Sequence, residues 1–330
     1  MDYQIPITRV ELELTEVCNL FCIFCYNSRN PKICEKPEVL IQSLSKSGVM
    51  ELILTGGEPS LHPRFFEILN YACSQIPRVM IQSNGTLFAN INFRNQLLQY
   101  PIFCLNFSLH GPQKIHDMLT GVEGSFNLTT QAIRFLTSSN IRLACNMVLT
   151  VYNSEPQIIQ ETVRLLEKMG VKEMTVTRFI PCGIGQHSQH LSVVPARFFE
   201  SLDVLRTETA KCKISLLLAN ALPACQIPST YWDLCSRCSF GLDKFYLDIN
   251  GNVLICGMSR VKLGNLHQKS LIDILSSSNL YSRYLEGSHL PLKCQTCDKL
   301  SLCGGGCRAS ALASTSQIDG EDLLCFQRNA

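Results

Sequence analysis

Residues 10–15 have the sequence VELELT and residues 18–25 the sequence CNLFCIFC, and these two adjoining stretches decide the fold of the chain. The first alternates apolar and polar residues, which is typical of a β-strand. The second sets three cysteines at C-x3-C-x2-C spacing, one thiolate short of a closed tetrahedral metal site. An iron–sulfur cube held by only these three thiolates would keep one iron open for a ligand. The alternatives are a chance cluster or a zinc knuckle, although the loop holds no fourth Cys or His.

Composition indicates a globular protein with metal sites. The chain has 330 residues, 46% of them hydrophobic, which suffices for a large barrel-like domain plus a smaller one. Its net charge of +2 provides no basic surface for nucleic acid, so we expect no such partner. It lacks a signal-peptide pattern and an apolar run of roughly 18 residues, so we expect a cytoplasmic protein without a membrane span. Eighteen cysteines in a reducing cytosol favour metal sites or buried thiols.

Strand and helix patterns alternate through the first half of the chain. This alternation predicts a parallel sheet of βα units. Six units before residue 180 predict an open, partial (β/α)6 barrel of the α/β class, short of the eight units that close a TIM barrel. We expect strands at 8–14, 50–55, 79–83, 102–108, 141–149 and 172–178, and helices at 37–48, 62–74, 91–99, 127–138 and 155–169.

The second half has a different character. A further helix at 197–211 and a strand at 213–219 are followed by dense cysteines and short strands. Asn250-Gly251 lies between two short apolar runs and predicts a β-hairpin, because both residues tolerate a positive φ. We therefore expect two domains, a barrel with its connecting helix at 1–224 and a small cysteine-rich domain at 225–330.

The cysteine loop resembles the signature of the radical S-adenosylmethionine (SAM) enzymes, in which SAM chelates the open iron of a [4Fe–4S] cluster. Gly56-Gly57-Glu58-Pro59, after the second strand, resembles the GGEP motif of the same family. The resemblance implies that Cys18, Cys22 and Cys25 hold the SAM-binding cluster. The positions that match SAM-contacting segments of the family are Phe24, Thr55, Gly56, Gly57, Glu58, Ser83, Ser108 and Asn146.

The resemblance also suggests roles at the SAM site. Glu58 would hold the amino group of SAM, and the glycines before it would let the backbone approach the ligand. Phe24 would pack near the adenine, and Ser108 would bind the ribose or the carboxylate. Asn146 is equally well explained as a satisfied polar residue in a strand. Relatives often carry an arginine at the position of Thr120, which would leave the SAM carboxylate here without that partner.

The C-terminal cysteines resemble the seven-cysteine pattern of the SPASM domain, which carries auxiliary iron–sulfur clusters. A zinc ribbon or ring-like module is the rival interpretation of the C-x2-C pairs. The pattern consists of Cys238-x12-Gly251-x4-Cys256, then Cys294-x2-Cys297-x5-Cys303-x3-Cys307, then x17 to Cys325.

With Cys235 there are eight cysteines, the number that two fully ligated [4Fe–4S] clusters need. The resemblance thus implies three [4Fe–4S] clusters, one that binds SAM and two auxiliary ones. If Cys235 is only structural, the first auxiliary cluster keeps an open iron for substrate. By analogy, the first takes Cys235, Cys238, Cys256 and Cys307, and the second takes Cys294, Cys297, Cys303 and Cys325.

The family implies that SAM is cleaved reductively to a 5′-deoxyadenosyl radical, which takes a hydrogen atom from the substrate. Its SPASM members mostly modify peptides, so we predict a maturase that crosslinks, epimerises or excises part of a ribosomally made peptide. Cys182 is a candidate hydrogen-atom donor, although simple packing explains it better. No residue stands out as a catalytic acid or base.

The alternatives are a sulfatase-type Cys/Ser oxidising maturase and a non-enzymatic iron–sulfur electron carrier or zinc scaffold. Sulfatase maturases carry an aspartate where this chain has Gly257, which counts against the first. We expect a precursor peptide and an electron donor of flavodoxin or ferredoxin type as partners. Because the first strand starts by about residue 8, we also expect a separate leader-peptide-binding protein in place of an N-terminal leader-binding domain.

Overall fold

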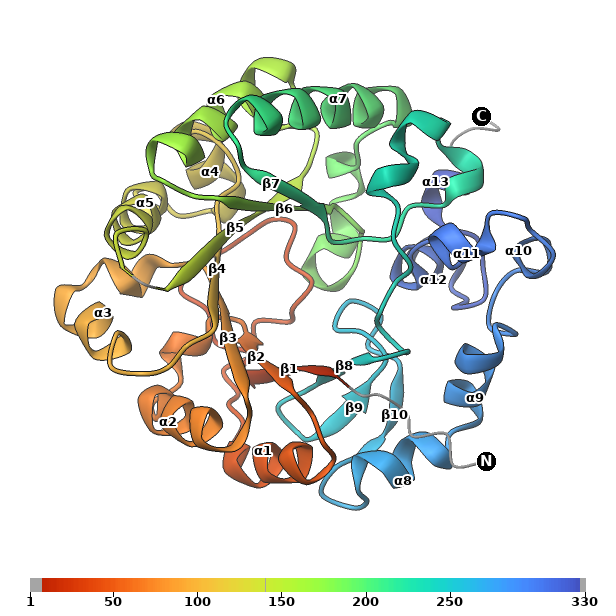
Figure 1. Ribbon diagram of the computed structural model, residues 1–330, viewed down its shortest axis with the longest axis horizontal. Coiled ribbons are helices and arrows are strands. Elements are labelled where there is room, and N and C mark those ends of the chain that lie inside the picture. The colour runs from red at the N-terminus through yellow and green to blue at the C-terminus, as the bar shows by residue number, and fades with distance from the viewer. Residues whose placement is uncertain (1–7, 140, 327–330) are drawn as a thin grey trace.

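The computed structural model describes residues 8–139 and 141–326, and its centre is one curved sheet of ten strands (Figure 1). Seven successive strands pair in parallel, which confirms the predicted α/β partial barrel and adds a seventh strand to its edge. These strands are β1 (Arg9–Thr15), β2 (Glu51–Gly56), β3 (Arg78–Ser83), β4 (Cys104–Ser108), β5 (Arg142–Leu149), β6 (Glu173–Arg178) and β7 (Ser215–Leu218).

The other edge of the sheet comes from the cysteine-rich half. Strand β8 (Lys244–Leu247) pairs in parallel with β1, and β9 (Asn252–Leu254) and β10 (Lys262–Asn265) follow in antiparallel order. The predicted hairpin is confirmed, with Gly251 at φ +75° in its turn. Since β8 extends the barrel sheet, the two halves share backbone hydrogen bonds, and the boundary near residue 225 stays a prediction.

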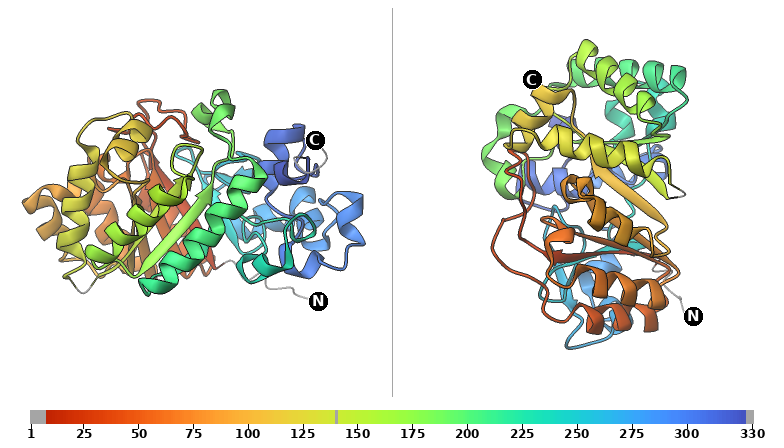
Figure 2. Two further views of the ribbon diagram at one scale, coloured as in Figure 1. Left: turned by 90° about the horizontal axis from the view of Figure 1, so that it is seen from above. Right: turned by 90° about the vertical axis from the view of Figure 1, so that its left-hand side faces the viewer.

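Helices cover the outer side of the curved sheet (Figures 1 and 2). Helix α6 shows why: Pro156 starts it, where a missing N–H costs nothing, and Ile159, Val163 and Leu166 bury one face. The short helix α4, which ends at Gly121, was not predicted. The outer helices are α1 (Pro37–Lys46), α2 (Phe65–Gln75), α3 (Ile91–Leu97), α4 (Gln113–Thr120), α5 (Ser125–Leu136), α6 (Pro156–Lys168) and α7 (Pro195–Lys211).

The two faces of the sheet differ in polarity. Residues such as Leu12 and Leu54 belong to the main hydrophobic core, as do the buried apolar residues of the outer helices. The alternate positions are buried but often polar, as at Glu13, Thr55 and Asn146. Because side chains alternate along a strand, these polar groups share the opposite, inner face. The inner face therefore offers hydrogen-bonding groups where a ligand of a parallel barrel binds.

The short helices of the cysteine-rich half lie on the side of the molecule between β7 and β8 (Figure 1). None of the helices in the described ranges is long and apolar enough to cross a membrane. The helices of this half are α8 (Leu271–Ser276), α9 (Asn279–Glu286), α10 (Leu292–Gln295), α11 (Leu300–Cys303), α12 (Arg308–Thr315) and α13 (Leu323–Phe326).

Candidate functional site

The three-cysteine loop lies at the carboxyl end of β1, where the end of α4 supports it. The amide of Phe21 donates to the carbonyl of Thr120 at 2.7 Å, and that of Ile23 to the carbonyl of Leu119 at 3.1 Å. Gly121 is required for this contact, because its φ is +70° and a Cβ there would lie 2.8 Å from the Phe21 carbonyl oxygen. An unpredicted helix thus fixes the loop through backbone contacts.

The thiols of this loop are half-buried and receive backbone hydrogen bonds. The amide of Leu20 donates to Cys18 Sγ at 3.4 Å, and the amide of Asn27 to Cys25 Sγ at 3.4 Å. Burial raises the pKa of Cys18 to about 11, and the nearby charges of Glu58 and Cys25 act in the same direction. Ligation must therefore displace protons from these sulfurs, as is usual for thiolate sites.

The Gly56-Gly57 turn packs on the start of the cysteine loop. The Gly57 amide donates to the Thr15 carbonyl at 2.6 Å, and the Glu58 amide to the Val17 carbonyl at 2.8 Å. A Cβ on Gly57 would lie 2.3 Å from the Val17 oxygen, and one on Gly56 2.3 Å from the Thr15 oxygen. The glycines are therefore needed for contact between two loops of the chain, a reason that differs from the expected approach to a ligand.

The Glu58 carboxylate is fully buried and binds its own chain. It accepts from Ser83 Oγ at 2.8 Å, from the Asn84 amide at 2.7 Å and from the Ser60 amide at 3.2 Å. Burial raises its pKa, and these hydrogen bonds lower it again in part. Glu58 and Ser83 thus tie the β2 loop to the end of β3, and their predicted contact with SAM stays a prediction.

A small amide network joins the cysteine loop to the β3 loop. Asn84 Nδ2 donates to Asn19 Oδ1 at 2.8 Å, and Asn19 Nδ2 donates to Thr86 Oγ1 at 2.8 Å. Asn84 Nδ2 also lies 3.9 Å from Cys18 Sγ. The sequence analysis did not select Asn19, although its place next to Cys18 was the available signal.

The remaining predicted SAM residues lie on the same inner face. Phe24 meets the His110 ring edge-on, with centroids 4.7 Å apart. Ser108 on β4 lies opposite Asn146 on β5, whose Oδ1 accepts from Thr177 Oγ1 at 2.8 Å. Thr55 is buried opposite Glu13. Thr120, at the position of the missing arginine, is buried and bonds to the His116 carbonyl at 2.8 Å.

A second group of thiols lies between the barrel and the C-terminal helices. Cys182, in the loop after β6, and Cys256, after β9, both pack on a small buried cluster that contains Cys307. Cys238 is close enough that the charges of Cys307 and Cys256 add to burial in raising its pKa. The structure thus brings together three of the four cysteines predicted for the first auxiliary cluster, and Cys182 joins them.

Cys235, the fourth predicted ligand of that cluster, lies elsewhere. It follows the 3₁₀-helix Ser229–Leu234, packs against the main core, and its Sγ lies 3.8 Å from the Tyr231 carbonyl oxygen. Burial raises its pKa to about 11, and the one thiolate whose charge adds to this effect is that of Cys303. Cys235 thus packs on the main core and not on the cluster that contains Cys307, and its predicted ligation of the first auxiliary cluster stays a prediction.

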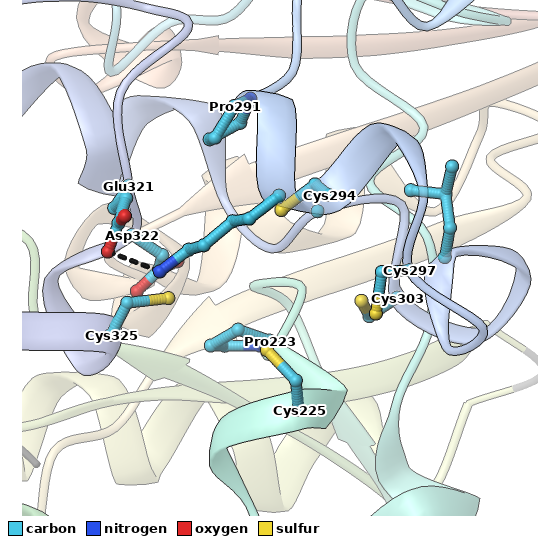
Figure 3. Close-up of a pocket in the computed structure, with 12 residues that line it drawn as sticks. Pro223, Cys225, Pro291, Cys294, Cys297, Cys303, Glu321, Asp322 and Cys325 are labelled. Atoms are coloured by element: carbon cyan, nitrogen blue, oxygen red, sulfur yellow. Dashed lines mark ion pairs between the residues drawn. The ribbon is translucent and has the colours of Figure 1, made fainter.

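A third group of thiols surrounds a pocket among α10, α11 and α13 (Figure 3). An ion pair closes one side, with Lys293 Nζ 2.6 Å from Glu321 Oε2. The sequence analysis missed Cys225, which comes from the 3₁₀-helix Ala224–Gln226 that precedes the hairpin. The pocket is lined by the four cysteines predicted for the second auxiliary cluster and by this fifth thiol, namely Cys294, Cys297, Cys303, Cys325 and Cys225.

The three groups of cysteines are suitable ligands for iron–sulfur clusters. Within residues 8–139 and 141–326, no three His, Cys, Asp or Glu side chains converge on a point that could hold a single metal ion. An iron–sulfur cube binds its cysteines through separate iron atoms, so its ligands need not converge in that way. Three sets made of thiols, two of them in the half that carries the hairpin, are the ligands that such clusters take.

Known proteins match both halves of the chain. The family model of the radical SAM superfamily matches residues 12–166, and that of an iron–sulfur cluster-binding domain, SPASM, matches residues 234–298. AdoMet-dependent heme synthase of Methanosarcina barkeri is 26% identical over 96% of this chain and 95% of its own. Sporulation killing factor maturation protein SkfB of Bacillus subtilis is 26% identical over 89% of this chain and 68% of its own.

A solved structure shares the fold. The crystal structure of Streptococcus suis SuiB bound to precursor peptide SuiA superposes with a TM-score of 0.75 at 17% identity, over 98% of this chain and 76% of that chain. The first matched range contains the three-cysteine loop, and the second contains the hairpin and the first of the C-terminal cysteines. The chain is therefore a radical SAM enzyme with a C-terminal SPASM domain.

Proposed function

We propose that this enzyme modifies a ribosomally made peptide by hydrogen-atom abstraction. The observation that carries the proposal is the contact between the loop after β6 and the three-cysteine loop. The Gly185 amide donates to the Cys25 carbonyl at 2.9 Å, and a Cβ on Gly183 would lie 2.1 Å from the Tyr26 carbonyl oxygen. Cys182 lies in the chain between the end of β6 and this contact, and it packs against the second group of thiols. The SAM site and an auxiliary site thus share one wall.

In this proposal each group of cysteines has its own role. Cys18, Cys22 and Cys25 hold three corners of the SAM-binding cluster. When bound, that cluster supplies the electron that splits SAM into methionine and a 5′-deoxyadenosyl radical. Glu58 and the glycines before it keep the loop in place through the contacts described above, and Phe24, packed on the buried His110 ring, shields that side of the site from water. The other two thiol groups hold two auxiliary [4Fe–4S] clusters, which makes three in all.

Similarity supports a peptide substrate. SkfB is named as a maturation protein, and the SuiB structure holds a precursor peptide. Sulfatase-type oxidation fits less well, because a Cβ on Gly257 would lie 2.7 Å from the Tyr246 ring and leaves no space for an aspartate. We propose a crosslink, an epimerisation or an excision as the outcome. In this proposal the protein works in the cytoplasm with a separate leader-binding protein and a flavodoxin or ferredoxin as electron donor.

A second candidate is heme synthesis. The match to the heme synthase of Methanosarcina barkeri runs over 96% of this chain and 95% of that protein, which is more even coverage than the match to SkfB. In this alternative the substrate is a tetrapyrrole precursor of heme. The same SAM site and the same hydrogen-atom abstraction would serve it.

One anaerobic experiment separates the two. The reconstituted protein is incubated with SAM, a reductant and either a short peptide encoded beside its gene or an iron-porphyrin carboxylic acid, and 5′-deoxyadenosine and the substrate mass are followed. A mass change in the peptide alone supports the leading proposal, and a change in the porphyrin alone supports the alternative. The Cys18/Cys22/Cys25→Ala variant should lose cleavage, whereas Cys73→Ala, on the outer helix α2, should keep it. Cleavage without the three cysteines contradicts both.

A further inference from the structure

The surroundings of Cys182 contain more than packing requires. Ile180, Cys307 and Ala309 form a buried cluster of their own, separate from the main core, and Cys182, Cys256 and Met258 pack on it. Three of these six residues are cysteines, and they come from three places, the loop after β6, the end of the hairpin strand β9, and the start of α12.

Cys238 belongs to the same region, because a Cβ on Gly241, three residues after it, would lie 3.1 Å from the side chain of Ile255, the neighbour of Cys256. Burial is the largest cause of its raised pKa, and the thiolate charges of Cys307 and Cys256 come next. The same charges act on Cys182. Burial raises its pKa to about 12, and the charges of Cys256 and Cys307 act in the same direction. Each of these thiols is thus within electrostatic reach of the pair Cys256 and Cys307.

Cys182 is also held in place by its neighbours. Gly183 adopts φ +56° against the Tyr26 carbonyl, so the residue after Cys182 cannot move toward the cysteine loop. Before it, Arg178 at the end of β6 binds Asp322, and Asp322 accepts from the Cys307 amide at 2.9 Å. The same ion pair therefore holds the end of β6, four residues before Cys182, beside Cys307. Within the described residues no such contact links Cys235 to Cys307; the Cys235 Sγ lies 3.8 Å from the Tyr231 carbonyl oxygen, and Cys235 packs against the main core.

We propose that Cys182, from the barrel, and not Cys235 is the fourth thiolate of the first auxiliary cluster, together with Cys238, Cys256 and Cys307. This assignment rests on the proposed function only in requiring that the auxiliary clusters exist. It makes the cluster a bridge between the barrel and the C-terminal half. It also closes the iron that would otherwise be open to substrate, and it removes Cys182 as a hydrogen-atom donor, because a ligating thiolate carries no hydrogen.

The test starts from the Cys18/Cys22/Cys25→Ala protein, which retains only auxiliary clusters, about eight iron atoms per chain. In that background we compare Cys182→Ala, Cys235→Ala and, as control, Cys73→Ala by iron and sulfide quantitation and by EPR after mild oxidation. Cys182→Ala should lose between one and four of those iron atoms, about 10–50%, and show a three-iron signal where the cube survives. Cys182→Ser should restore the iron with an altered spectrum. The Cys235 and Cys73 variants should match the background protein.

A second measurement needs no variant. The intact anaerobic holoprotein is alkylated with iodoacetamide and mapped by mass spectrometry before and after its clusters are removed. Cys182 should be protected until removal, whereas Cys235 should react at a similar rate in both states. Full iron in Cys182→Ala together with alkylation of Cys182 in the holoprotein would overturn the assignment and leave the proposed function intact. A background protein without iron would overturn the auxiliary clusters themselves and, with them, the proposed function.

Discussion

Arg178 at the end of β6 binds both carboxylate oxygens of Asp322, with each nitrogen 2.9 Å from its oxygen, and the side chains are only 9% and 0% exposed. Asp322 also accepts from the Cys307 amide at 2.9 Å and from Ser310 Oγ at 3.1 Å. Because Asp322 lies between Cys307 and Cys325 in the chain, this ion pair joins the barrel to the segment that carries these two cysteines.

We predict that Asp322→Asn destabilises the protein strongly. It leaves the buried guanidinium of Arg178 without a counter-charge, and breaking a buried pair in this way costs about 3–5 kcal/mol. The measurement is the free energy of unfolding from anaerobic denaturant titration. The control is Asp233→Asn, because Asp233 is 59% exposed in its pair with Arg206, and such surface pairs contribute about 0–1 kcal/mol. Equal losses in the two variants would contradict the role given to Asp322.

We make a parallel prediction for a second ion pair, which joins β1 to the segment between β9 and β10. Arg260 binds the fully buried Glu13 on β1 at 2.9 Å, and Asn27 donates to Glu13 Oε1 at 2.7 Å. Arg260→Ala should reduce the free energy of unfolding by about 3–5 kcal/mol, since the Glu13 charge stays buried. The double variant Arg260→Ala/Glu13→Gln should recover part of that loss. A double variant that is no more stable than the single one would show that Arg260 acts through packing.

Gly57→Ala should damage the SAM site through sterics. Its Cβ would lie 2.3 Å from the Val17 oxygen and 2.7 Å from the Glu16 oxygen, so the start of the cysteine loop must shift. Such overpacking costs about 1–3 kcal/mol. We expect the loss of about four of twelve iron atoms and a drop in 5′-deoxyadenosine formation of at least tenfold.

The control for Gly57→Ala is Gly48→Ala. Gly48 has φ +78° and nothing within 4 Å of a Cβ, so this variant adds backbone strain without a clash at the site. Its iron content should equal that of the wild type. A Gly57→Ala protein with full iron and normal SAM cleavage would show that the loop contact tolerates an added methyl group.

His116 on α4 should make stability depend on pH. Its ring is 1% exposed, and burial lowers its pKa to about 4 from the usual 6.5. The unfolded chain therefore binds more protons than the folded protein between these values, so stability falls as the pH drops from about 6.5 to about 4, by up to about 3 kcal/mol.

The check is the pH slope of unfolding free energy in His116→Asn, whose side-chain oxygen can replace Nδ1 as acceptor for the His110 amide. The slope between pH 6.5 and pH 4 should be shallower than in the wild type. The exposed His190→Asn variant serves as control and should keep the wild-type slope. An unchanged slope in His116→Asn would assign the pH dependence to other groups.

The local pattern determined the class of fold and the main site. Alternation of strand and helix patterns predicts parallel βα units, because each periodicity follows from how side chains project from its own element. The C-x3-C-x2-C spacing and the GGEP turn are each defined by a few consecutive residues, so both could be recognised before the fold was known. The hairpin at Asn250-Gly251 was predictable for the same reason, since a short local turn with Gly251 at a positive φ decides it.

The tertiary structure decided which distant residues meet. Cys182 and Cys307 lie far apart in the sequence, and spacing along the sequence carries no information about their packing on one small cluster. Cys235 precedes Cys238 by three positions, but only the fold shows that it follows a 3₁₀-helix and packs against the main core. Glu58 was recognisable as a motif residue, but its partners Ser83 and Asn84 became visible only when β2 and β3 were paired. Local sequence sets the conformation of each element, whereas packing between elements sets the ligands of a shared site.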